Sequence, residues 1–187
     1  NLIALAYGAG ITGMLPIYAT RLGADSALIG LYLALGFLAL AVSSIVVGRL
    51  SDRFQNRKTF LIVGGTLVAP LTWLMGQATS FTQLMLLTAA AWFAVGFAIT
   101  MINVLAGLSS QESERGRVFG IVGLGGGMGA VVGSLASGPI VDRWGFTTLF
   151  TLAAIIYLMM PVAGLFLKDK HVAPIQKMGS AVTARGM

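Results

Sequence analysis

Long apolar runs alternate with short polar stretches along the whole chain. Each apolar run is close to the ~20 residues that a helix needs to cross a bilayer. We therefore predict six membrane helices, over residues 1–20, 27–48, 59–77, 81–107, 116–138 and 146–167. A polar stretch, 168–187, follows the last run. The pattern predicts an all-α integral membrane protein with one six-helix domain, 1–167, and a cytoplasmic linker or tail.

The short connections between the runs predict how the helices are oriented. Such links force neighbouring helices to run antiparallel, so successive connections lie on opposite sides of the membrane. One side collects ten of the twelve Lys and Arg residues: Arg49, Arg53, Arg57, Lys58, Arg115, Arg117, Lys168, Lys170, Lys177 and Arg185. Arg21 and Arg143 fall on the other side. Because basic residues gather in cytoplasmic loops, we expect 49–58, 108–116 and the tail in the cytoplasm, with the protein in the cell (inner or plasma) membrane.

Composition narrows the class of protein further. Only 10% of the 187 residues are charged and 57% are hydrophobic, which is too little charge to cover a soluble domain. The basic residues lie in short clusters between apolar runs, so we expect a lipid bilayer around the chain and no nucleic-acid partner. The chain has no cysteine, one histidine and no nucleophile–base pair. We therefore predict no metal site, no cofactor and no enzymatic activity.

One motif occurs twice. The residues GRLSDRF, 48–54, recur as GPIVDRW, 138–144, exactly 90 positions later, and both fit G-x-[LI]-x-D-R-[FW]. One copy follows the second predicted helix and the other follows the fifth, so the two copies lie on opposite faces of the membrane. Three helices repeated with inverted topology are typical of transporters, whose substrates bind between the repeats near the membrane midplane. The fold class that we predict is therefore a 3+3 inverted repeat.

The charged stretch GRLSDRFQNRK, 48–58, lies between two apolar runs and is predicted to be a cytoplasmic turn. It resembles the signature loop of the major facilitator superfamily of secondary transporters, G-x-L-x-D-R-x-G-R-R-[KR], with Gln55 and Asn56 as departures. The residues ERGR at 114–117 and DRWGF at 142–146 are similar to further sequences of that family. The resemblance covers the whole chain, which corresponds to half of a family member with two six-helix halves.

The resemblance implies alternating access of a small solute, driven by a proton or another coupling ion, with a second six-helix half as partner. The present half is expected to be the N-terminal one, because its loop matches the stronger copy of the signature; the C-terminal half is the alternative. Family drug–proton antiporters carry an arginine in helix four and a G-P-x-x-G-G sequence in helix five. Here Trp92 stands at the position of that arginine, and Asp142-Arg143 stand at the position of the glycine pair. The direction of transport, efflux or uptake, therefore stays undecided.

The signature residues are expected to form a gate. Asp52 can complement the positive N-terminal end of a helix in the second half. Arg53 and Arg57 can pair with Glu112 or Glu114 in the next cytoplasmic loop, and exposed pairs of this kind are worth only ~0–1 kcal/mol each, which suits a reversible latch. The gating candidates are Gly48, Asp52, Arg53, Arg57, Lys58, Glu112 and Glu114.

In the family, the first and fourth helices of each half line the central cavity, so their polar residues are candidates for solute binding. Trp92, Gly96, Thr100 and Asn103 form one helical stripe on helix four. Tyr7 and Thr12 lie at similar depth on helix one, so the cavity candidates are Tyr7, Thr12, Trp92, Thr100 and Asn103. Helix packing is the alternative role for Trp92 and Asn103. A non-transporting sensor or scaffold on the same fold is the alternative function.

Overall fold

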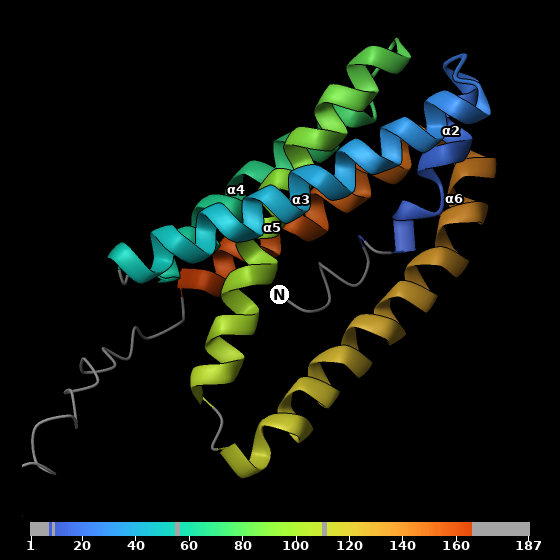
Figure 1. The fold of residues 1–187 in the computed structure, drawn as a ribbon. Coiled ribbons are helices and arrows are strands. Elements are labelled where there is room, and N and C mark those ends of the chain that lie inside the picture. Colours follow the sequence, from blue (N-terminus) through green and yellow to red (C-terminus); the bar gives the residue numbers. More distant parts are fainter. Residues whose placement is uncertain (1–7, 9, 55–56, 110–111, 166–187) are drawn as a thin grey trace, which may run out of the picture.

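The computed structural model describes residue 8 and residues 10–54, 57–109 and 112–165. Every regular element in this part of the chain is a helix, which confirms the all-α prediction (Figure 1). Ser26–Ser51, Phe81–Val104 and Arg115–Val162 are long and apolar enough to cross a membrane, and Thr59–Met75 is a shorter apolar helix. At 1.5 Å per residue the first two span ~39 and ~36 Å, which exceeds the ~30 Å hydrocarbon core.

The first predicted helix is interrupted. Residues 10–12 are helical, 13–14 form a turn, and helix α2 then runs Leu15–Arg21. Pro16 lies in the first turn of α2, where a missing N–H costs no helical hydrogen bond. The Tyr18 hydroxyl donates to the Ala78 carbonyl at 3.1 Å and so ties α2 to the connection after α4.

Helix α3 is longer than predicted. It runs Ser26–Phe54, and Asp25 caps its start by accepting a hydrogen bond from the Leu28 N–H at 2.8 Å. Helix α4 runs Arg57–Met75. The stretch that we predicted as a turn is therefore helical through residue 54, because its arginine and leucine residues favour a helix that continues beyond the membrane.

Helices α5 and α6 complete the order. Helix α5 runs Phe81–Ser109, and a short 3₁₀ helix, η1, covers Glu112–Glu114. Helix α6 runs Arg115–Leu165 with a break at Gly145, where φ is 78° and ψ is 175°. The predicted fifth helix thus continues to residue 144, and the chain turns back at one glycine, the residue that adopts positive φ at no steric cost. We call 115–144 the first arm of α6 and 146–165 its second arm.

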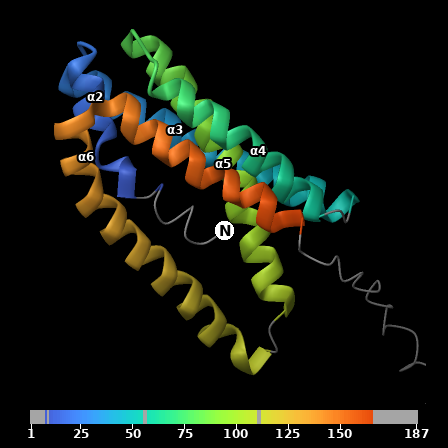
Figure 2. The same ribbon diagram turned by 180° about the vertical axis from the view of Figure 1, so that it is seen from behind.

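Helices α3, α4, α5 and the second arm pack together, while the first arm stands away from them (Figures 1 and 2). Small residues allow the close approach that drives helix association in membranes. A methyl group on Gly96 of α5 would lie 2.7 Å from the Ser43 Cβ of α3. One on Gly65 of α4 would lie 2.9 Å from the Met160 Cβ of the second arm.

Large apolar side chains face outward from the bundle. Leu31 and Leu38 of α3 are more than half exposed, as are Leu158 and Met159 of the second arm. An outward apolar surface on apolar helices of this length is suited to lipid and not to water. The chain is therefore an integral membrane protein.

Candidate solute-binding cavity

A cavity of about 350 Å³ lies between the helices. Its wall is formed by the segment around residues 8–15, by α3, α4 and α5, and by the second arm of α6. Most of the lining side chains are aliphatic or aromatic, and none of the described residues that line it is charged. Its polar groups are the hydroxyls of Thr12, Thr72 and Tyr157 and the indole of Trp92.

Trp92 is the cavity's largest side chain on α5. Its indole packs against Gly36 of α3, where a methyl group would lie 3.1 Å from the ring. Phe37 meets the same indole edge-on, with ring centroids 4.8 Å apart. Trp92 therefore both packs against α3 and lines the cavity.

Thr12 also lines the cavity, from the segment that precedes α2. Its hydroxyl donates to the Gly8 carbonyl at 3.2 Å, within the same helical turn. The structure thus brings Thr12 and Trp92, which are candidates from helices one and four, to one cavity. Tyr7, the other candidate on helix one, lies outside the described residues.

The remaining helix-four candidates do not line this cavity. On α5 the lining residues are Ala91, Trp92, Val95 and Ile99. Gly96 instead packs on Ser43, whose hydroxyl donates to the Phe93 carbonyl at 2.5 Å. The cavity face of α5 is therefore rotated by about one residue, or ~100°, from the predicted stripe. Thr100 is half-buried and Asn103 is exposed.

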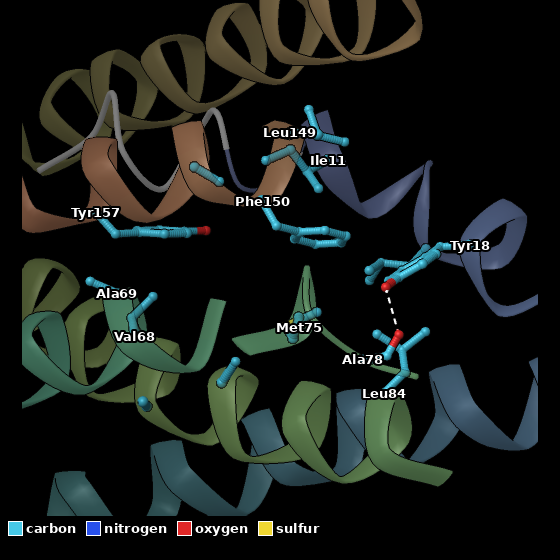
Figure 3. Close-up of a cluster of buried hydrophobic side chains, with 14 of the residues drawn as sticks. Ile11, Tyr18, Val68, Ala69, Met75, Ala78, Leu84, Leu149, Phe150 and Tyr157 are labelled. Carbon is cyan, nitrogen blue, oxygen red and sulfur yellow. Dashed lines mark hydrogen bonds between the residues drawn. The ribbon is translucent and has the colours of Figure 1, made fainter. Parts of the chain in front are cut away.

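Sequence reasoning missed two cavity groups outside helices one and four, Thr72 of α4 and Tyr157 of the second arm. Figure 3 shows Tyr157 and Phe150 side by side on the second arm, facing Ala69 and Met75 of α4. A hydroxyl in an apolar membrane helix carries a desolvation cost. The presence of Thr72 and Tyr157 within apolar runs was therefore the sequence signal that could have identified them.

The signature residues lie apart from the cavity. The cavity residues on α3 are Phe37 and Leu40, and Gly48 comes two turns later on the same helix. A methyl group on Gly48 would meet nothing within 4 Å, so no other described residue packs closely against this glycine.

The gate predicted at the signature stays a prediction. Arg53 and Glu114 both have exposed side chains. For Asp52, Arg57, Lys58 and Glu112, the structure describes the backbone, which is helical in each case, and their side-chain pairing lies outside what it describes.

The helical bundle with its cavity defines a class, the polytopic membrane proteins whose helices pack around a cavity. Comparison with known proteins identifies the family. The family model for the Major Facilitator Superfamily matches residues 1–184, so the chain belongs to that superfamily.

Two curated relatives carry the same printed name. The chain is 33% identical over 168 residues to the "Multidrug resistance protein MdtG" of Klebsiella pneumoniae (strain 342), covering 87% of this chain and 40% of the relative. It is 32% identical to the protein of that name from Citrobacter koseri, covering 87% of this chain and 41% of the relative. The chain thus spans about two fifths of the length of these relatives.

Proposed function

We propose that this chain is the N-terminal six-helix half of a secondary transporter that expels a small organic solute by alternating access. The family supports the transporter class. The relatives named for multidrug resistance favour export over uptake. The observation that carries the proposal is the cavity, because its wall takes residues from both halves of the predicted repeat: Thr12 and Phe37 from the first, Trp92 and Tyr157 from the second.

The cavity's chemistry suits an uncharged or weakly charged solute with an aromatic or aliphatic body. Ligand sites of this kind are mostly apolar, with a few polar groups that orient the ligand, and range over ~300–1,000 Å³. Trp92 and Phe37 offer an aromatic corner, and aromatic rings prefer offset or edge-to-face contacts with one another. A charged solute would find no countercharge among the described lining residues.

The coupling ion is proposed to bind outside this cavity. The described residues that line the cavity include no carboxylate, histidine or lysine, which are the groups that exchange protons or bind cations near neutral pH. The second six-helix half is the proposed location, and the same half is the proposed partner of the signature residues. Opening and closing at the cytoplasmic side would then alternate with access from the outside.

Flux measurements test the proposal. The complete protein, as its gene encodes it, is reconstituted in liposomes and presented with labelled chloramphenicol and related uncharged aromatic compounds under imposed proton and sodium gradients. We expect gradient-dependent movement of at least one compound, abolished when the gradient is collapsed. A protein that moves none of them under either gradient, although folded and inserted, favours the sensor or scaffold instead.

A further inference from the structure

We propose that the cavity contains a hydrogen-bonding subsite, formed by the hydroxyls of Tyr157 and Thr72, that recognises a carbonyl oxygen on an uncharged aromatic ligand. The inference rests on the proposed function in so far as the cavity is the solute site. It adds a specificity determinant on α4 and on the second arm of α6, away from the helices one and four on which the sequence prediction concentrated.

Both residues are nine-tenths or more buried. Tyr157 is 7% exposed and Thr72 is 6% exposed, and both line the cavity. In the part of the chain that the structure describes, neither hydroxyl makes a hydrogen bond to another protein group, and both residues line the cavity. A ligand in the cavity can therefore pair with hydroxyls that the protein itself leaves unpaired.

Other hydroxyls in this bundle have partners within the protein. Tyr32 and Thr88 pair with each other at 2.9 Å between α3 and α5. On the second arm itself, the Thr151 hydroxyl donates to the Thr147 carbonyl at 2.7 Å, within its own helix. Ser51 is an exception, since its buried hydroxyl has no partner, but it does not line the cavity. Tyr157 and Thr72 differ from it because their unpaired hydroxyls line the cavity, where a ligand can bond to them.

A glycine makes room for the Tyr157 phenol. A methyl group built on Gly8 would overlap the phenol oxygen of Tyr157. Gly8 is helical, so no unusual backbone angle explains a glycine there. Its small size is what allows the phenol to stand at the cavity edge.

The ligand's chemical class follows from the rest of the wall. A hydroxyl donates to a carbonyl oxygen, so each of the two hydroxyls on the cavity wall suits a ligand that carries such an acceptor. The aromatic corner of Trp92 and Phe37 provides contacts for a planar body. With no charged lining residue among those described, the ligand that fits is an uncharged aromatic ketone or amide.

A matched pair of ligands isolates the subsite. Fluorenone and fluorene have the same rigid tricyclic body and differ in the carbonyl oxygen. Binding of each tritiated compound is measured to the complete protein in lipid nanodiscs. Wild-type protein is expected to bind fluorenone about five- to tenfold more tightly than fluorene, the range of one or two net hydrogen bonds.

The variants remove the hydroxyls and keep the packing. Tyr157→Phe alone should reduce the fluorenone preference two- to fourfold, and Tyr157→Phe with Thr72→Val should bring the two affinities together. Thr151→Val, which removes a hydroxyl from the same arm but not from the cavity, should leave the preference unchanged. Tyr157→Phe is nearly isosteric because it removes only the hydroxyl. If the double variant does not fold, the fluorenone preference of Tyr157→Phe alone decides the test.

Three results overturn the subsite: an undiminished preference in Tyr157→Phe, equal losses for fluorenone and fluorene, or no saturable fluorenone binding to wild-type protein. Failure of the transport proposal would look different. In that case the hydroxyl-dependent preference persists in nanodiscs, while the liposome experiment shows no gradient-driven flux.

Discussion

The ring of Phe37 stands edge-on to the indole of Trp92, with centroids 4.8 Å apart and ring planes at 79°. The pair joins α3 to α5 across the cavity wall, and Gly36 makes room for the indole on the α3 side. Edge-to-face aromatic pairs contribute about 0.5–1.5 kcal/mol beyond their buried area. The same two rings thus stabilise the helix pair and present an aromatic surface to the cavity.

Trp92→Ala should raise the apparent substrate constant about tenfold or abolish export, because it removes the largest aromatic surface of the cavity. The measurement is concentration-dependent efflux from cells that express the complete protein, with membrane levels compared by immunoblot. Trp73→Ala is the matched control, since Trp73 is 46% exposed on α4 and does not line the cavity. Equal losses in both variants would argue for a general packing effect.

Asn103→Ala distinguishes the predicted helix-four stripe from the cavity that the structure shows. Asn103 is exposed on α5, beyond Ile99, the last α5 residue to line the cavity. We expect the substrate constant to change less than twofold in the same efflux assay. A change as large as that of Trp92→Ala would show that the solute site extends along the stripe toward the cytoplasmic end.

Gly96→Ala should lower thermal stability, because the added methyl group would meet the Ser43 side chain and lie 3.2 Å from the Leu40 carbonyl oxygen. Overpacking of this kind costs about 1–3 kcal/mol. Gly30→Ala is the control, on a helical glycine of α3 with nothing within 4 Å. Fluorescence-detected size-exclusion chromatography after heating should show a lower midpoint for Gly96→Ala and an unchanged or higher one for Gly30→Ala.

The orientation predicted from charge can be tested at exposed positions. Ser113 and Gln77 have exposed side chains on connections that are predicted to face opposite sides, whereas Ser51 and Ala24 are buried and unsuited to labelling. In a cysteine-free background, Ser113→Cys should react with an impermeant maleimide only after the cells are opened. Gln77→Cys should react in intact cells. Labelling of both from one side would contradict the six-helix topology.

Asp52→Asn should reduce export about two- to fivefold while leaving expression and thermal stability close to wild type. The change keeps the side chain's shape and removes the charge proposed to complement a helix end in the second half, an interaction of about 0.3–1 kcal/mol at an exposed site. Arg57→Ala should also reduce export, because Arg57 is proposed to pair with Glu112 or Glu114 in the next cytoplasmic loop. Normal export by both variants would leave the stretch 48–58 with a role in topology alone.

Run length and residue type were sufficient to predict that the chain is helical and membrane-spanning. The prediction that α5 begins at residue 81 agrees with the structure, because Ser80 caps that helix by accepting a hydrogen bond from the Gln83 N–H at 3.3 Å. Helix ends were harder to predict. α3 continues to residue 54 because a helix that leaves the membrane has no reason to stop where the apolar run stops.

Helix rotation and contacts between distant segments were decided by the tertiary structure. A sequence stripe shows which α5 residues share a face, but only packing against Ser43 turned Gly96 toward α3 and left Val95 and Ile99 on the cavity. Likewise, nothing local in the sequence relates Thr72 to Tyr157. They line one cavity because α4 packs against the second arm, which reaches that position through the reversal at Gly145. The sequence by itself determined the helices and the membrane that they require, since both follow from local composition, whereas the cavity depends on side chains from different helices and exists only once those helices pack.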